Sequence, residues 1–307
     1  MKLLVALGGN ALLQRGQAPS AQNQSANINV AADQLARVAA GNGLVVTHGN
    51  GPQIGLLALQ AASGDPATAS SLDTLGAETD GLIGYLLEQS LANRLPPDRA
   101  VATLLTRVEV DPCDPAFAKP SKPIGPIYAA AEATRLAQQR HWVVGPDGSG
   151  LRRLVASPQP QRILGLEPIR WLIERGAVVI AAGGGGIPVA LSADGRSHHG
   201  VEAVIDKDAC SALLAQQLGV DCFVIATDVT GVSLDWGTPQ QREIRRISPQ
   251  ALARHRFAAG SMGPKVDAAC AFALATGRRA MIGSLGHIEA MLAGQSGTEV
   301  CVDAFDV

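Results

Sequence analysis

Short, unbroken runs of apolar residues recur along the whole chain, and segments with helical apolar spacing separate them. Runs without polar alternation are typical of strands that are covered on both faces, as in a parallel sheet between two layers of helices. The pattern therefore predicts an α/β sandwich built from βαβ units. The expected strands are residues 3–7, 44–47, 100–105, 177–182, 222–227, 280–283 and 299–302.

Two segments have the spacing of helices. Residues 73–95 place Leu75, Leu82, Ile83, Leu86, Leu87 and Leu91 near one helical face, which predicts a long amphipathic helix. Residues 208–219 predict a second helix, with Asp208 as its N-cap and Gly219 as its end.

One region breaks the alternation of strands and helices. Residues 111–161 are rich in proline, glycine and aspartate, which indicates an excursion from the sheet, such as a small flap. No linker in the sequence divides the chain into two independent domains.

Composition narrows the class of protein. With 307 residues and 47% hydrophobic content, the chain can bury a full core. The net charge of -2 and the scattered arginines give no field for a polyanion, so we expect no nucleic-acid partner. Five cysteines without a CxxC pair fit reduced thiols. The longest apolar stretch is broken by four glycines and a proline, so it is not expected to span a membrane. No apolar leader follows Met1, so we expect a cytoplasmic protein without a membrane partner.

Three expected strands end in glycine loops, at residues 6–12, 47–55 and 181–189. In a parallel sheet these loops lie at the carboxyl ends of strands, where ligands bind and where the next helix presents backbone N–H groups. Each loop alone could be a tight βα turn. Three together favour a phosphate or carboxylate site.

Familiar site motifs are absent from the sequence. "GSMGPKVD" lacks the spacing of a P-loop, and "GNGPQIG" has Ile54 where the last glycine of a dinucleotide loop belongs. "SHHG" lacks the ligand pattern of a zinc site. His48, beside the second glycine loop, is either a polar contact of the site or a buried histidine with its own partner.

Lysine is rare in this chain, and its positions are informative. Only five residues are lysine, and we interpret Lys2 and Lys119 as solvated charges. Lys122, Lys207 and Lys265 are framed by turn-forming residues or carboxylates. Because lysine is a compact point charge that can follow a moving phosphoryl group, these three are candidate functional residues. Carboxylates beside them can orient the ammonium groups or bind Mg²⁺, although Asp208 could simply cap a helix.

Six segments together closely resemble the carbamate kinases, which belong to the amino acid kinase superfamily. They follow in order along essentially the whole chain: "VALGGNAL", "THGNGPQIG", "TRVEVDPCDPAFAKPSKPIGPIY", "AGGGGIPV", "GVEAVIDKDACSALLA" and "FAAGSMGPKVDAA". The resemblance implies an open αβα sandwich with a mainly parallel sheet of about eight strands and a small protruding subdomain. It further implies a single domain over residues 1–307, with a carbamate lobe at 1–205, a protruding subdomain at about 112–160 and a nucleotide lobe at 206–307.

The same resemblance implies an activity. Family members transfer a phosphoryl group reversibly between MgATP and carbamate, giving ADP and carbamoyl phosphate, and are often homodimers that make ATP during arginine or allantoin breakdown. We expect these partners here, with Mg²⁺ carried by the nucleotide and contacted, if at all, by Asp206 or Asp208. Catalysis would need no general base, since carbamate is already an anion.

Site residues carry over by matching motif positions. The expected catalytic residues are Lys122, Lys207, Lys265, Asp206 and Asp208, with Lys122 on the protruding subdomain. The expected substrate-binding residues are Gly8, Gly9, Asn10, Gly49, Asn50, Gly51, Gly184 and Gly185. The expected nucleotide-binding residues are Lys207, Thr227, Asp228, Val232, Trp236, Met262, Gly263, Pro264 and Lys265.

Two positions separate this chain from its relatives. Ala6 stands where acetylglutamate kinase and similar enzymes usually carry a lysine, so Lys122 would supply the missing charge. Glu78 and Asp80 stand in "ETDG", where many carbamate kinases have Thr or Ser, Gln, Gly. If these carboxylates faced the acceptor site they would repel carbamate, and a kinase of the same fold that acts on another small acid is then the alternative. If they faced solvent or a dimer partner, nothing would change. A non-catalytic nucleotide or metabolite sensor is a further hypothesis, against which the retained lysines and aspartates argue.

Overall fold

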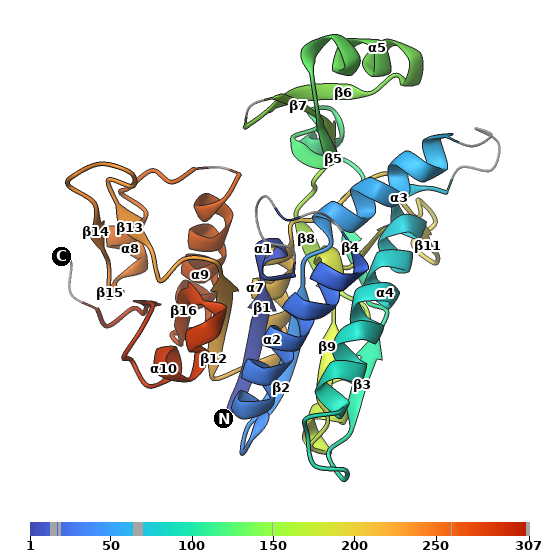
Figure 1. Cartoon of the computed structure of the whole chain (residues 1–307). Coiled ribbons are helices and arrows are strands. Elements are labelled where there is room, and N and C mark those ends of the chain that lie inside the picture. Colours follow the sequence, from blue (N-terminus) through green and yellow to red (C-terminus); the bar gives the residue numbers. More distant parts are fainter. Residues whose placement is uncertain (13–16, 18–19, 64–69, 149, 259, 305–307) are drawn as a thin grey trace.

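One eight-stranded, mainly parallel sheet forms the centre of the fold (Figure 1). The computed structural model of the chain describes residues 1–12, 17, 20–63, 70–148, 150–258 and 260–304. All neighbouring strands are parallel except β16 and β17. In spatial order the strands are β15 (Arg246–Ile247), β17 (Thr298–Val300), β16 (Arg279–Ser284), β12 (Cys222–Thr227), β1 (Lys2–Leu7), β2 (Gly43–His48), β9 (Val178–Ala181) and β3 (Val101–Leu104).

The sheet confirms the fold class that the apolar runs predict. All seven expected strands coincide with strands of this sheet. The eighth strand, β15, was not predicted, because a strand of two residues is too short to appear as an apolar run in the sequence.

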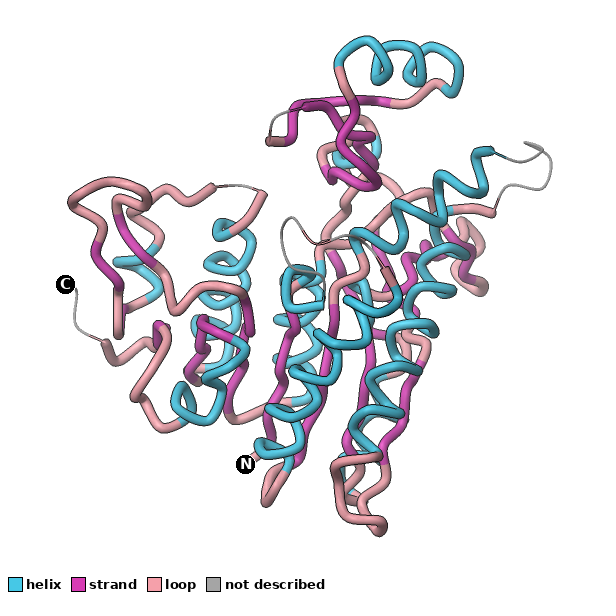
Figure 2. Tube along the Cα trace, viewed as in Figure 1, coloured by secondary structure: helices cyan, strands magenta, loops and turns pink. Residues whose placement is uncertain are grey.

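Helices cover both faces of the sheet, and Figure 2 shows the strands between them. Alternate residues of β1 enter different cores: Leu4 and Ala6 belong to one buried cluster, and Leu3, Val5 and Leu7 to the other. The first cluster packs against α6 (Leu166–Glu174), α7 (Lys207–Leu218), α8 (Pro249–Leu252) and α9 (Met262–Thr276). The second packs against α2 (Ala21–Ala39), α4 (Leu72–Ala92) and α10 (Ile288–Leu292). Strands buried on both faces explain the absence of polar alternation.

Both expected helices exist, with corrections in detail. In α4, Leu75, Ile83, Leu87 and Leu91 are buried, but Leu82 is 46% exposed and lies off the buried face. Helix α7 ends at Gly219, which adopts the left-handed conformation as a C-cap. Its N-cap is Asp206 and not the expected Asp208. The Asp206 side chain accepts hydrogen bonds from the backbone N–H groups of Asp208 and Ala209, because only the residue before the first turn can reach them.

The proline-rich region leaves the main sheet. A three-stranded sheet in the order β5 (Lys122–Tyr128), β7 (Gly150–Val155) and β6 (Val143–Asp147) carries α5 (Ala130–Arg140), and it projects from the body at the top of Figure 1. We call residues 122–148 and 150–155 the flap. The flap packs on α3 (Gly51–Ser63) through β5. A Cβ atom on Gly55 of α3 would overlap with the backbone of Gly125, so the two backbones are in direct contact.

The remaining elements connect these parts. A four-stranded sheet has the order β11 (His198–Gly200), β10 (Ile187–Leu191), β4 (Arg107–Val110) and β8 (Pro160–Ile163). Shorter elements are α1 (Gly9–Leu12), the hairpin strands β13 (Ser233–Leu234) and β14 (Arg242–Glu243), and the 3₁₀ turns η2 (Pro115–Phe117), η3 (Gly183–Gly185) and η4 (Leu285–His287). Within the part of the chain that the structure describes, no helix has the length and apolar character needed to cross a membrane.

Candidate active site

The three glycine loops meet at the carboxyl edge of the sheet, as their strand positions predict. Gly8 donates its N–H to the carbonyl of Ala226 at 2.8 Å, and Gly49 donates to the carbonyl of Leu7 at 3.1 Å. A Cβ atom on Gly49 would lie 3.1 Å from the Gly9 nitrogen. The first two loops are therefore packed backbone against backbone. The side chain of Asn10 lies outside the described residues.

The third loop, at η3, completes this edge. Ala182, Gly184, Gly185 and Gly186 all have positive φ angles, at 52°, 67°, 98° and 80°. A Cβ atom on Gly184 would overlap with the Asn50 amide, so the second and third loops touch at a point where only glycine fits. Five of the expected substrate-binding glycines thus lie at one edge with Asn50: Gly8, Gly9, Gly49, Gly184 and Gly185.

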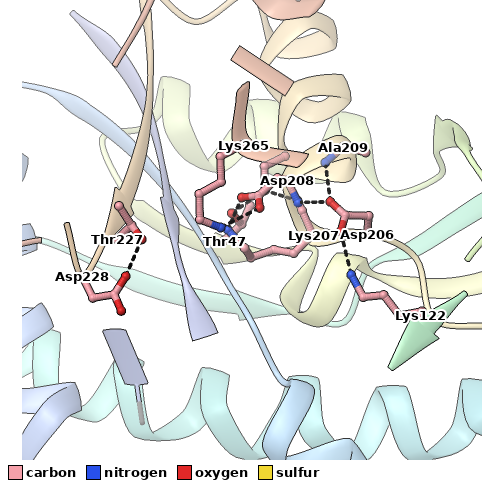
Figure 3. Close-up of polar contacts among 10 residues, drawn as sticks. Thr47, Lys122, Asp206, Lys207, Asp208, Ala209, Thr227, Asp228 and Lys265 are labelled. Carbon is pink, nitrogen blue, oxygen red and sulfur yellow. Dashed lines mark hydrogen bonds and ion pairs between the residues drawn. The ribbon is translucent and has the colours of Figure 1, made fainter. Parts of the chain in front are cut away.

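Three of the five lysines converge beside these loops on two carboxylates (Figure 3). Lys207 Nζ lies 2.5 Å from Asp208 Oδ1, and Lys265 Nζ lies 3.0 Å from Asp208 Oδ2. Lys122 Nζ, from the first residue of the flap, lies 2.6 Å from Asp206 Oδ2. The lysines come from β5, α7 and α9, so the fold assembles this cluster from segments more than 50 residues apart.

Burial and charge shift the acidities within the cluster. Burial alone would raise the pKa of Asp208, but the Lys207 and Lys265 ammonium groups hold it far below its ordinary value. Burial would likewise raise the pKa of Asp206. The ion pair with Lys122 and the hydrogen bond from the Ala209 N–H outweigh burial, so the pKa of Asp206 is lowered overall. Burial lowers the pKa of Lys207, although its contact with Asp208 opposes this shift. Both carboxylates are therefore ionised at neutral pH and compensate the lysine charges.

Two hydroxyl groups that the sequence did not single out join this cluster to the sheet. Thr47 Oγ1 lies 2.7 Å from Ser211 Oγ, and the Ser211 hydroxyl donates to the Lys207 carbonyl at 2.7 Å. Ser211 lies four residues after Lys207, one turn along α7. This spacing was the only feature of the sequence that could have indicated its contact with Lys207. The contact fixes the first turn of α7 against the end of β2.

The expected nucleotide-binding residues are divided between exposed and buried positions. Thr227 ends β12, and its hydroxyl donates to Asp228 Oδ1 at 3.0 Å. Trp236 is 66% exposed. Met262, Gly263, Pro264 and Lys265 form the first turn of α9.

Val232 does not fit a role in nucleotide binding. Its side chain is fully buried in the core. Its N–H donates to Thr298 Oγ1 at 2.8 Å, and its carbonyl accepts from the N–H of Ile244 at 2.8 Å. Both backbone polar groups of Val232 already have partners within the protein and its side chain has no exposed surface, so we remove it from the candidate set.

Glu78 and Asp80 do not lie together on one surface. Glu78 is exposed to solvent. Asp80 is fully buried, with its Oδ1 3.5 Å from Nε2 of the fully buried His48. Asp80 therefore faces a basic partner under the loops.

Comparison with known proteins places this geometry in a family. The amino acid kinase family model matches residues 1–284. The chain belongs to the amino acid kinase family. Its relatives include a carbamate kinase of Haemophilus influenzae, 52% identical over 98% of this chain and 96% of the relative. Another is a carbamate kinase of Rhizobium meliloti, 53% identical over 100% of this chain and 95% of the relative.

Solved structures of family members agree with the fold. Carbamate kinase from Giardia lamblia bound to AMP-PNP has a TM-score of 0.87 and 36% identity, with 98% of both chains covered. UMP kinase from Bacillus anthracis, at 16% identity and a TM-score of 0.54, shares the fold alone. The resemblance read from the six sequence segments is confirmed at the level of the family.

Proposed function

We propose that this chain is a carbamate kinase, which transfers a phosphoryl group reversibly between MgATP and carbamate and forms ADP and carbamoyl phosphate. The observation that carries the proposal is the cluster of Lys122, Lys207 and Lys265 on two carboxylates, at the edge where three glycine loops meet. Phosphoryl transfer depends on positioning and charge neutralisation, and this edge supplies both. Relatives of about 50% identity along the full chain carry the same name.

In the proposed reaction, a carbamate oxygen attacks the γ-phosphorus of ATP in line with the bond to the β-phosphate oxygen. The new P–O bond gives carbamoyl phosphate, and the old bond breaks with its electron pair on ADP. Lys207 and Lys265 flank the transferred group and neutralise its equatorial oxygens. Lys122, carried on the flap, neutralises the acceptor side, where Ala6 offers no charge.

The loops bind the acceptor through the backbone. The N–H groups of Gly8, Gly49 and Gly185 already donate to the carbonyls of Ala226, Leu7 and Ala182, so these glycines would let the backbone approach the anion closely. Gly9, Gly51 and Gly184 would present their N–H groups to it. Gly51 is the first residue of α3, and the N–H groups of a first helical turn have no partner within the helix. Asn50 and Asn10 would add side-chain amides.

Mg²⁺ would arrive with the nucleotide. Among the described residues, no group of three histidine, cysteine or carboxylate side chains could hold a metal ion by itself. Mg²⁺ usually keeps several waters and binds phosphates together with one or two carboxylates. Asp208 or Asp206 could contribute an oxygen, and the bound ion would supply further charge neutralisation at the phosphates.

These roles assign the two substrates to different parts of the chain. Residues 1–205 would hold carbamate and residues 206–307 the nucleotide, with Thr227, Asp228, Trp236 and the first turn of α9 around the nucleotide. We propose that the enzyme works as a cytoplasmic homodimer and runs toward ATP during arginine or allantoin breakdown.

Acceptor choice tests this function directly. Purified protein with labelled MgATP should phosphorylate carbamate, supplied as ammonium and bicarbonate, and leave acetate, N-acetylglutamate and UMP unchanged. Preferential phosphorylation of another acid would show that this acid, and not carbamate, is the substrate. Nucleotide binding without transfer to any acceptor would favour the sensor hypothesis.

A further inference from the structure

Two consecutive residues of α4 reach across to the end of β2. The Asn50 amide donates to Thr79 Oγ1 at 2.9 Å, and Asp80 Oδ1 lies 3.5 Å from His48 Nε2. His48, Thr79 and Asp80 are 0% exposed and Asn50 is 5% exposed. We call these two contacts, Asn50–Thr79 and His48–Asp80, the α4 brace.

The α4 brace touches the third glycine loop. A Cβ atom on Gly183 would overlap with Asp80 Oδ1 and with the His48 ring, and one on Gly184 would overlap with the Asn50 amide. The loop backbone therefore rests on these side chains without free space. Since Ala182, directly before these glycines, has a φ angle of 52°, which is rare for a residue other than glycine, the loop has a conformation that its surroundings must hold in place.

Charge distinguishes the two contacts of the brace. Neither oxygen of Asp80 has a hydrogen-bond partner among the described residues, and a lone buried carboxylate is costly. His48 presents Nδ1 to the Gly49 carbonyl at 3.3 Å and Nε2 to Asp80. Both ring nitrogens of His48 therefore face acceptor oxygens, and His48 is the basic side chain that lies beside the buried Asp80 carboxylate.

We propose that His48 and Asp80 are positioning residues for the acceptor substrate. Their contact fixes the backbone of Gly183 and Gly184 against Asn50, and so sets the shape of the pocket that binds carbamate. This inference rests on the proposed function of the same loops. It gives Asp80 a role that its unusual place in the "ETDG" sequence did not suggest.

The substitution Asp80→Asn tests this role, because it removes the charge and keeps the shape. The KM for carbamoyl phosphate should rise roughly 10- to 100-fold, since small misplacements of binding groups have effects of this size. The KM for ADP should stay within about twofold, as the nucleotide binds on the other side of the lysine cluster. Glu78→Gln is the matched control, because it removes an exposed charge from the same helix and should change neither constant.

A double variant tests whether the two residues act as a pair. His48→Gln alone leaves the buried Asp80 carboxylate without its imidazole partner, whereas His48→Gln with Asp80→Asn leaves two neutral amides. The double variant should therefore bind carbamoyl phosphate better than His48→Gln alone. Strictly additive losses, an unchanged KM in Asp80→Asn, or equal rises for both substrates would overturn the inference.

Hydrogen exchange separates this inference from the proposed function. If the parent protein makes ATP and Asp80→Asn behaves like the parent, the function stands and the positioning role fails. If the parent makes no ATP, the amides of residues 182–186 still report on the brace. Faster exchange in Asp80→Asn than in Glu78→Gln supports the positioning role, and equal exchange overturns it.

Discussion

Single residues of the lysine cluster combine structural roles with the catalytic roles that we propose. Asp206 caps α7 with one oxygen and holds Lys122 with the other, so the start of the helix and the first residue of the flap depend on the same side chain. Asp208 accepts one lysine on each oxygen. Compensated in this way, the lysine charges can lie close together until an anionic substrate replaces the carboxylates as their partner.

Asp206 should contribute to stability in a pH-dependent way. Its pKa is lowered in the folded chain, so its contribution is present above its unfolded pKa of about 4 and is lost as the pH falls through the folded value. Asp206→Asn keeps an N-cap acceptor but not the charge. Urea unfolding should show a less stable variant at about pH 7, with the difference from the parent shrinking as the pH falls below the unfolded pKa of about 4. A difference that does not depend on pH would show that the charge makes no contribution.

At the scale of elements, the flap depends on close backbone contact. Gly55 of α3 lies directly against Gly125 of β5, and Gly125 has a φ angle of 77°. A side chain at Gly55 has no space unless the flap moves away from α3. Because Lys122 begins β5, such a movement would also displace this lysine from the cluster.

Gly55→Ala should therefore lower kcat and cost about 1–3 kcal/mol of stability, as overpacking does, with little change in ADP affinity. Gly76→Ala is the control, since a Cβ atom there meets nothing within 4 Å and alanine favours the helix. Steady-state kinetics and thermal unfolding measure both effects. Equal kinetics in the two variants would show that the flap does not need this contact.

The sequence predicted most elements for a simple physical reason. Strands covered on both faces must be continuously apolar, and loops at their carboxyl ends need glycine, so both leave local signals. The cap of α7 was assigned to Asp208 in place of Asp206, because both carboxylates lie near the expected helix start. The pairing of His48 with Asp80 has no local signal, since it forms only when α4 packs beside β2.

At the scale of the whole molecule, one exposed apolar surface is consistent with the proposed dimer. Leu56 of α3 and Leu82 of α4 line a common pocket and are 47% and 46% exposed, and Tyr85 on α4 is 56% exposed. Leu105 follows the edge strand β3 and is 59% exposed. A second copy of the chain would cover these side chains.

Leu82→Glu should convert a dimer to a monomer, because a dimer interface would bury the introduced charge. Light scattering should give the parent twice the chain mass of 31.6 kDa and the variant that mass once. Leu274→Glu, at an exposed position of α9 on the other face of the sheet, is the control and should remain dimeric. A monomeric parent would exclude the dimer.

ATP formation from MgADP and carbamoyl phosphate measures the central claim most directly, with the parent, Lys122→Ala and Lys119→Ala compared side by side. Lys119 lies in the same loop and is exposed, so its variant changes charge without touching the cluster. The parent and Lys119→Ala should make ATP, and Lys122→Ala should lose roughly 100- to 1,000-fold in kcat with nearly unchanged ADP affinity. Absence of ATP with the folded, ADP-binding parent, or equal rates in both lysine variants, would contradict phosphoryl transfer by this cluster.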